Sequence, residues 1–328
     1  MGASAQTALK SPVKVIFDTD IGGDIDDALA LAMLHALADR SEVEILAVTI
    51  SKDNPYSAVH TDIINRFYGR PNIPIGVVKK GKRPEDGYSK TVAMRKLNGE
   101  FVYPRGLQSG DDAPEAIGLI RKILAQEPDG SVVMLSVGPM TNMARLLQST
   151  PDEHSGLNGI ELVGRKIKSY VTMAGEFRPG AAPEFNIHID APAAKTVFDQ
   201  WPTAIIASGY DVGEAVNYPA ESVEKDFGYV RDHPVAEAYR EYAKMPYDRP
   251  TWDLSAVLYA ARPDRGYFDL SEAGWITVDD KGATHFAKAN DGRHRYFILP
   301  TENRSRVLEA YLWLVSEPPR NNSSRQGK

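Results

Sequence analysis

Residues 13–34 read VKVIFDTDIGGDIDDALALAML, and this stretch predicts how the chain begins to fold. The segment VKVIF (13–17) has the apolar, β-branched composition of a short buried strand. Apolar side chains then recur every four residues, which predicts one buried face of a helix that Asp26 or Asp27 opens. Five aspartates fall within residues 18–27, between the strand and the helix. Close carboxylates repel one another and burial makes each charge costlier, so their gathering here requires a physical explanation.

The alternation of strands and helices continues along the chain and predicts the fold class. Further buried strands are expected at residues 43–50, 73–78, 131–138, 168–175 and 203–210, and helices at 55–69, 113–127, 140–148, 190–201, 234–245, 252–261 and 303–315. Residues 79–110 read as a long loop, and residues 267–300 as antiparallel strands joined by turns. We therefore expect an α/β fold with a mostly parallel central sheet flanked by helices and a small antiparallel β annex. A single domain is expected over residues 1–328, with flexible tails at 1–12 and 320–328.

The composition excludes several classes of function. The 328 residues are 42% hydrophobic and 25% charged, which is typical of a globular protein, and the net charge of −6 argues against a nucleic-acid polymer as partner. The locally basic KKGKR (79–83) is read as a solvated loop. The absence of cysteine excludes disulfides and thiolate–zinc sites. No apolar run reaches the length of a membrane span, and MGASAQTALKSP (1–12) lacks the apolar core of a signal peptide, so a soluble protein is expected and its compartment and oligomeric state stay open.

The five aspartates are best explained by a cation. One or two of them would be read as turn formers or helix caps, because aspartate favours both. Five beside a buried strand are explained more simply if an ion relieves their repulsion, and hard oxygen ligands suit calcium or magnesium. Gly22 and Gly23 allow the tight backbone turn that lets carboxylates distant in sequence converge on one ion.

Other expected strand and helix ends supply further oxygen ligands at the same edge of the sheet. Each has an alternative reading, because Asn54 precedes a proline and suits a turn, while Asp190 and Asp253 suit helix N-caps. Their shared position beside the carboxyl ends of parallel strands, where ligands bind in such sheets, favours a common site. The candidates are Asp53, Asn54, the carbonyl of Val137, Glu184, Asn186, Asp190 and Asp253.

These residues carry a resemblance to a known family. DTDIGGDIDDALAL (18–31) resembles the N-terminal signature DxDPGxDDAxAL of the nucleoside hydrolases, the calcium-dependent N-ribohydrolases. The resemblance implies their Rossmann-like fold and hydrolysis of the N-glycosidic bond of a ribonucleoside or related pentoside. It continues, in the family's order, through DNP (53–55), LSVGPMTN (135–142), EFNIHIDAPAA (184–194) and WDLSAVLYA (252–260).

The resemblance implies a calcium ion and names its ligands. Asp20, Asp27 and Asp253 match the calcium-binding carboxylates, and the carbonyl of Val137 matches a backbone ligand. Asp20 also matches the general base that takes a proton from a calcium-bound water, which then attacks the anomeric carbon of the sugar.

The resemblance also implies how the sugar is held. Asp26 and Asn54 match residues that hold the ribose 2′- and 3′-hydroxyls, and Glu184 and Asn186 match residues that hold the ribose towards O3′ and O5′. Asp18 matches the first aspartate of the signature, which we read as support for the loop.

The sequence departs from the family pattern in three places. Two extra residues precede the Asp26–Asp27 pair, so Asp24 has no counterpart and competes with either aspartate of the pair. Trp252 stands where members place a histidine that protonates the leaving base; tryptophan cannot act as an acid but can stack on a base or sugar. His188, in a segment expected as a strand, is a candidate substitute only if that strand is regular. Arg178, in a shortened loop, would meet a charged group at the 5′ end of the sugar or pair with surface acids.

Three alternative functions stay open. One is a hydrolase of another carbohydrate, and a second is a non-catalytic, calcium-dependent sugar-binding protein. The third is a haloacid-dehalogenase-type phosphatase, because VIFDTD (15–20) ends in Asp-x-Asp. That family expects threonine or valine where Gly22 stands, which argues against it.

Overall fold

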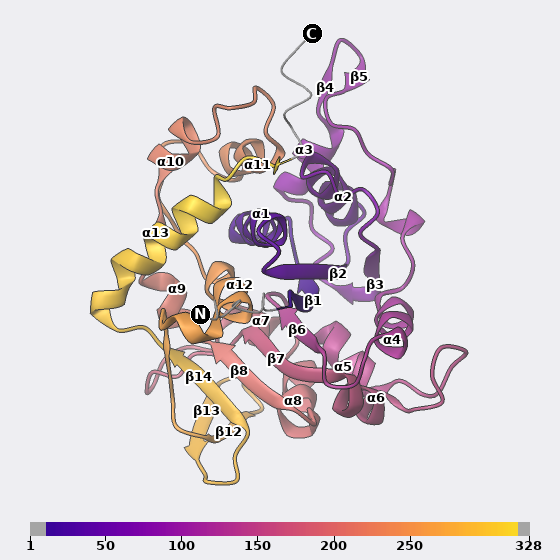
Figure 1. Ribbon diagram of the computed structural model, residues 1–328, viewed down its shortest axis with the longest axis vertical. Coiled ribbons are helices and arrows are strands. Elements are labelled where there is room, and N and C mark those ends of the chain that lie inside the picture. The colour runs from indigo at the N-terminus through magenta and orange to yellow at the C-terminus, as the bar shows by residue number, and fades with distance from the viewer. Residues whose placement is uncertain (1–10, 321–328) are drawn as a thin grey trace, which may run out of the picture.

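A ten-stranded sheet crosses the protein in the computed structural model, which describes residues 11–320 (Figure 1). Seven neighbouring strands run parallel, in the order β3-β2-β1-β6-β7-β8-β14. Most of their side chains are buried, because helices cover both faces of the sheet. The bounds are β1 Val13–Thr19, β2 Val43–Lys52, β3 Ile75–Lys82, β6 Val132–Ser136, β7 Ile167–Met173, β8 Ala204–Ser208 and β14 His294–Ile298.

The antiparallel strands expected in residues 267–300 are confirmed, and they extend the central sheet. β14 is parallel to β8, while β11 (Asp269–Leu270) and β12 (Gly274–Val278) pair with β14 in the antiparallel sense. β13 (Thr284–Lys288) pairs with β12 and forms the edge of the sheet. Two small sheets lie apart from it and consist of β4 (Lys96–Leu97) with β5 (Glu100–Phe101) and β9 (Asn217–Tyr218) with β10 (Arg249–Pro250).

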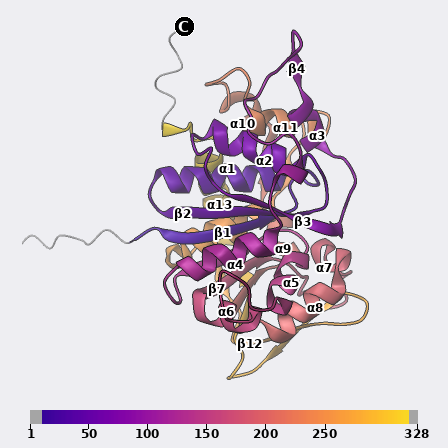
Figure 2. The same ribbon diagram turned by 90° about the vertical axis from the view of Figure 1, so that its right-hand side faces the viewer.

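Helices form a layer on each face of the sheet, and each layer has its own apolar core (Figure 2). One layer contains α1 (Asp26–Asp39), α2 (Ser57–Phe67), α11 (Pro234–Tyr242), α12 (Asp253–Ala261) and α13 (Arg304–Val315). The other contains α4 (Ala116–Gln126), α5 (Thr141–Gln148), α6 (Gly159–Lys166) and α8 (Ala191–Gln200). The mostly parallel α/β fold expected from the sequence is therefore confirmed.

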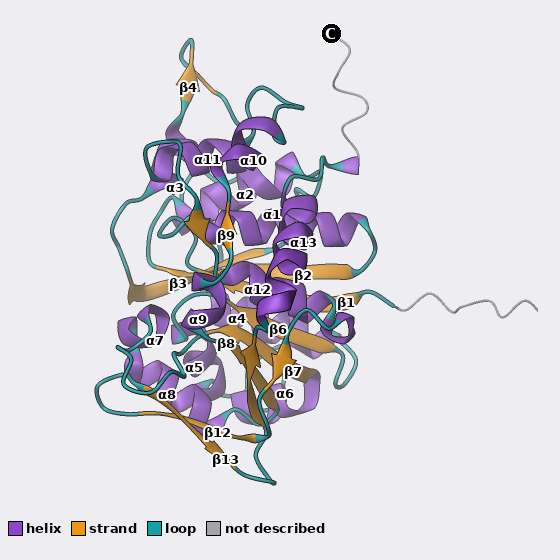
Figure 3. Cartoon of the chain, turned by 90° about the vertical axis from the view of Figure 1, so that its left-hand side faces the viewer, coloured by secondary structure: helices purple, strands orange, loops and turns teal. Residues whose placement is uncertain are grey.

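Helices from distant parts of the chain pack together in the first layer. α12 and α13 both contact α1, although α1 begins at Asp26 and α12 only at Asp253 (Figure 3). This packing places the N-terminus of α12 beside that of α1, as the hydrogen bond from the Asp253 N–H to the Asp26 carboxylate, across 227 residues, shows. Shorter helices in connecting segments are α3 (Tyr88–Met94), α7 (Phe185–Ile189), α9 (Tyr210–Glu214) and α10 (Ala220–Lys225), with 3₁₀ turns at Gly110–Asp112, Pro263–Arg265 and Thr301–Asn303.

Two local predictions were wrong. Residues 79–110 are not one loop, because β3 continues to Lys82 and α3, β4 and β5 follow it. Residues 184–190 are not a strand: the Glu184 carboxylate accepts the N–H groups of Asn186 and Ile187 and so caps the N-terminus of α7. A helix of five residues is too short for its periodicity to be read from sequence.

No helix within residues 11–320 is both long enough and apolar enough to cross a lipid bilayer. Residues 1–10 and 321–328, which make up most of the predicted tails, lie outside the described residues.

Candidate active site

A cavity of about 400 Å³ lies at the carboxyl ends of the parallel strands, where open α/β sheets bind ligands. Nine side chains or carbonyls singled out from the sequence line it: Asp20, Asp24, Asp26, Asp27, Val137, Glu184, Asn186, Trp252 and Asp253. It is also lined by residues that the sequence analysis did not single out, namely Arg83, Met173, Phe185, Tyr210, Tyr242 and Arg249. No histidine of the described chain is among the lining residues.

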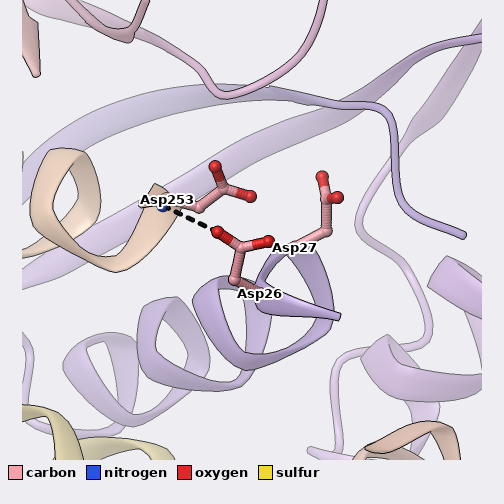
Figure 4. A group of neighbouring side chains, drawn as sticks. All are labelled: Asp26, Asp27 and Asp253. Carbon is pink, nitrogen blue, oxygen red and sulfur yellow. Dashed lines mark hydrogen bonds between the residues drawn. The ribbon is translucent and has the colours of Figure 1, made fainter. Parts of the chain in front are cut away.

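Three aspartates at the floor of the cavity form an acidic cluster (Figure 4). Asp26 and Asp27 begin α1 and Asp253 begins α12, and one oxygen of each lies within 4.8 Å of the others. All three are buried. Burial and then neighbouring aspartates raise the pKa of Asp26 to about 8 and the pKa values of Asp27 and Asp253 well above the ordinary range. Without a cation, therefore, the cluster holds protons near neutral pH.

Hydrogen bonds fix the orientation of the cluster. One oxygen of Asp26 accepts the backbone N–H groups of Trp252 (2.8 Å) and Asp253 (3.2 Å), so this carboxylate binds the N-terminus of α12. The positive end of the helix dipole favours a negative charge there. Thr19, at the end of β1, donates its hydroxyl to the other aspartate of α1, Asp27. The cluster is thus held by β1 and by both helices.

Asp20 lies beside this cluster and pairs with an arginine. Its carboxylate accepts a hydrogen bond from Arg83 Nη1 at 2.5 Å. Burial raises the pKa of Asp20, while the charges of Arg83 and Lys52 oppose that rise. The reading of residues 79–83 as a solvated loop was therefore wrong for Arg83, whose side chain is largely buried and points into the cavity.

The segment that follows β3 holds Arg83 in place. Arg83 Nε donates to Glu85 at 2.8 Å, and Glu85 also accepts from Lys52, which is only 1% exposed. Asn54 donates its amide to the carbonyls of residues 84 and 85 and to Asp86. Asn54 therefore lies behind the cavity wall, and its expected contact with ribose stays a prediction.

Glu184, Asn186 and Val137 meet on the opposite wall. Asn186 donates its amide to the Val137 carbonyl at 2.9 Å, which leaves that carbonyl one further lone pair. Burial raises the pKa of Glu184 to about 7, although the N–H groups of Asn186, Gly175 and Ile187 oppose the rise. The exposed ring of Phe185 lies between these residues and Arg83, whose guanidinium is 4.8 Å from the ring centre.

Asp18 supports the loop from below. It is fully buried and accepts hydrogen bonds from Thr49 on β2 (2.5 Å) and Asn142 on α5 (2.7 Å). Burial raises its pKa to about 7, with the two hydrogen bonds opposing. Asp18 does not line the cavity, so its placement agrees with the supporting position expected from the sequence.

Asp24, which had no expected partner, pairs with Arg249. Both Asp24 oxygens accept hydrogen bonds, from Arg249 Nε and Nη2. The guanidinium lies 5.2 Å from the ring centres of both Tyr242 and Trp252. Trp252 in turn donates its indole N–H to the Tyr210 carbonyl at 2.9 Å. The loop expansion, β10 and an aromatic wall therefore form one side of the cavity.

Four other candidates lie away from the cavity. Arg178 is half exposed and pairs with the buried Glu176 and with the surface acid Glu214, so its charge is used by acids outside the cavity. His188 is exposed on α7 and does not line the cavity. Asp53 accepts the Gly81 N–H and Asp190 caps α8, so these two serve local structure.

The oxygen donors fit a hard divalent cation. Carboxylates from the segment after β1, from α1 and from α12, together with one backbone carbonyl, line the cavity, and neither cysteine nor histidine is among the lining residues. Such all-oxygen sets suit calcium or magnesium. Gly22, at φ +108°, supplies the left-handed turn that brings Asp20 round to the acids of α1.

Comparisons with known proteins agree with this fold. Residues 15–308 match the family model of the inosine-uridine preferring nucleoside hydrolases. The pyrimidine-specific ribonucleoside hydrolase RihA of Salmonella enteritidis is 32% identical over 284 residues, which cover 82% of this chain and 85% of that protein. RihA of Photobacterium profundum is 30% identical over 260 residues, covering 74% and 75%. The structure of the inosine-uridine preferring nucleoside hydrolase from Bacillus anthracis has a TM-score of 0.68 at 20% identity, covering 92% of this chain and 99% of that one.

The fold and the acidic cavity thus define an N-glycosyl hydrolase. The chain belongs to the inosine-uridine preferring nucleoside hydrolase family, whose members cleave the bond between ribose and base.

Proposed function

We propose that this protein hydrolyses the N-glycosidic bond of a ribonucleoside or related pentoside and that it requires calcium. The observation that carries the proposal is the buried cluster of Asp26, Asp27 and Asp253 at the floor of a cavity. Three carboxylates this close need either protons or a cation, and an all-oxygen set suits calcium. Asp20, Asp27, Asp253 and the Val137 carbonyl would hold the ion. When bound, it would supply positive charge that makes a water molecule in the cavity easier to deprotonate.

Asp20 is the group that we assign to accept the proton of the attacking water. It lies between the acidic cluster and Arg83, and its pKa is raised by burial. A raised pKa makes a carboxylate a better base at neutral pH, as long as it stays ionised. The ion pair with Arg83 opposes complete protonation and so keeps Asp20 able to accept a proton.

The remaining acids suit a sugar whose ring gains positive charge. In N-glycoside cleavage the transition state resembles an oxocarbenium ion, and nearby carboxylates stabilise it. We assign Asp26 to the ribose hydroxyls beside the cluster, and Glu184 and Asn186 to the opposite side of the sugar. Asn54 is assigned to hold the segment carrying Arg83, because its amide bonds that segment. The ring of Trp252 would stack against the base or the sugar.

A screen of nucleosides and pentosides for release of reducing sugar tests the proposal. We expect turnover with calcium, loss of turnover with a chelator, and at least a hundredfold loss in Asp20→Ala. Asp280→Asn, which changes an exposed acid of the turn between β12 and β13, is the matched control and should retain activity. If calcium binds and no substrate in the screen turns over, the hydrolase proposal is wrong.

A second candidate function is a calcium-dependent sugar-binding protein without turnover. It is favoured by one observation: no histidine of the described chain lines the cavity, and Trp252 cannot protonate a leaving group. Calorimetric binding of ribose or a nucleoside, with no sugar released over many hours, would select this alternative.

A further inference from the structure

The loop expansion that sets this chain apart from the family signature has a specific partner. Asp24 lies in the expansion and binds Arg249 with both carboxylate oxygens, across 225 residues. Bidentate pairing fixes the plane of a guanidinium as well as its position. β10, which contains Arg249, is itself paired with β9, so the arginine is held from both ends.

Aromatic rings complete the enclosure of this arginine. Tyr242 and Trp252 each place a ring centre 5.2 Å from the guanidinium carbon. Trp252 is fixed by its backbone N–H, which donates to Asp26, and by its indole N–H, which donates to the Tyr210 carbonyl. A guanidinium stacked on rings and held by a carboxylate keeps its charge, because burial lowers the pKa of Arg249 but Asp24 more than restores it.

One edge of the guanidinium remains available to a ligand. Nε and Nη2 donate to Asp24, which leaves Nη1 without an acceptor among the residues that the structure describes. Arg249 lines the cavity, and its side chain is 27% exposed. It lies on the Trp252 side of the cavity, the position at which family members place a leaving-group acid. Arg249 therefore presents a permanent positive charge where the base would depart.

We propose that Arg249 is a specificity-determining residue that stabilises negative charge on the departing group, so that the preferred substrates are ribosides whose leaving group departs as an anion. This inference rests on the proposed hydrolysis. The bond from C1′ to the leaving atom breaks and its electron pair stays on that atom. The water oxygen bonds to C1′, and the water proton passes to Asp20. The anion leaves paired with Arg249 and takes its proton later from solvent.

The chemistry of arginine explains why Arg249 would stabilise an anionic leaving group without giving it a proton. Arginine keeps its proton at any ordinary pH, so it cannot protonate the leaving group as a histidine does. It can donate a charge-assisted hydrogen bond, which is worth about 10- to 100-fold in rate or affinity when the acceptor carries a full charge. Groups that can depart as anions, such as oxo-substituted nucleobases or nitrophenols, can use this contact, and the less acidic of them gain most because they stabilise the negative charge least by themselves.

Aryl ribosides test the inference because substituents on the ring change leaving-group acidity without changing the sugar. We would measure kcat and KM for a series that includes 4-nitrophenyl β-ribofuranoside, in the wild type, Arg249→Gln and Arg249→Lys. We expect Arg249→Gln to lower kcat/KM about 10- to 100-fold and to make the rate depend more steeply on leaving-group acidity. Arg249→Lys should restore part of both. The control Arg262→Gln removes a similar two-bonded pair, with Glu42, outside the cavity and should change neither.

A binding measurement separates failure of this inference from failure of the proposed function. Calorimetry would compare 4-nitrophenolate with neutral nitrobenzene in the wild type and in Arg249→Gln. We expect the anion to bind about tenfold more weakly to the variant and nitrobenzene to bind equally well to both. Equal anion binding, or an unchanged dependence on leaving-group acidity, would mean that Arg249 only fastens the loop to β10. If no riboside is cleaved by the wild type, the proposed hydrolysis fails, and anion binding alone decides the role of Arg249.

Discussion

Replacing Asp253 with asparagine should stabilise the metal-free protein and abolish its response to calcium. Asp253 has an oxygen within 4.8 Å of oxygens of both Asp26 and Asp27. Two unit charges at that distance repel by about 3.5 kcal/mol at an effective dielectric constant of about 20. The substitution removes two of the three repulsive pairs while keeping the backbone N–H that binds Asp26.

Protonation relieves most of this repulsion, because the pKa of all three acids is raised by burial and by their neighbours. An acid whose pKa is higher in the folded state binds extra protons there, so it costs increasing stability as pH rises from its ordinary pKa, about 3.9 for aspartate, to that folded pKa. At pH 8 we expect the wild type to be less stable than the variant by at least about 2 kcal/mol, which corresponds to about 3 °C in Tm for a chain of 328 residues. At pH 4, close to the ordinary pKa of aspartate, the two proteins should melt at nearly the same temperature.

Thermal unfolding at pH 4 and pH 8, with a chelator or with calcium, measures these effects. Calcium at about 100 times its Kd should stabilise the wild type by about 2.7 kcal/mol and leave Asp253→Asn unchanged. The exposed-acid variant Asp280→Asn should follow the wild type throughout. A variant that melts below the wild type in chelator at pH 8, or that keeps the full calcium response, would refute the assignment of these acids to one ion.

Three further predictions follow from the other walls of the cavity. Burial raises the pKa of Glu184 from 4.5 to about 7, so the free energy of unfolding should fall as pH rises between these values. Urea titrations at pH 4.5 and 7.5 should show that Glu184→Gln removes about 3 kcal/mol of this fall. A variant whose free energy of unfolding falls as much as that of the wild type would contradict the prediction. Arg83→Gln removes the charge that lowers the pKa of Asp20, so the acid limb of the plot of kcat/KM against pH should move up by about one pH unit. An acid limb at the same pH as in the wild type would mean that Asp20 is not the base. Gly138→Ala would place a methyl group 2.8 Å from Asp20 Oδ1 and 2.5 Å from Ser51 Oγ, and these contacts would displace the Asp20 carboxylate. We therefore expect kcat to drop about 100-fold while Tm changes little. Full activity would show that catalysis tolerates displacement of Asp20.

The sequence predicts the acids of the site well because their positions follow from the strand–helix alternation. Asp20 follows the end of β1, and Asp26 and Asp27 begin the helix behind it. Parallel strands bring their carboxyl ends to one edge of the sheet. Apolar periodicity that identifies the strands and helices is therefore enough to predict that the acids at these ends lie close together. Asp253 joins them because it begins another helix of the same layer.

The two arginines of the cavity could not be predicted in this way. Arg83 and Arg249 come from short segments interrupted by proline, where no periodicity indicates which side chain points inward. Arg83 enters the cavity because β3 runs further than its apolar residues indicate. Arg249 is placed by Asp24, a contact between residues far apart in sequence. The resemblance places Asn54 at the ribose, which stays a prediction, and nothing in the sequence indicated that its amide also binds the segment after β3.

The contact between the starts of α1 and α12 has a consequence for the order in which the protein is made. The ribosome completes Asp26 and Asp27 long before Asp253, so an ion at this site has only part of its ligand set during most of synthesis. Joining them closes a loop of 227 residues, and the entropy of that closure is met only after β1, β2, β3, β6, β7 and β8 have been synthesised. Metal binding would therefore come late in folding and stabilise strands that have already assembled. It would not be the step that brings the first strands together.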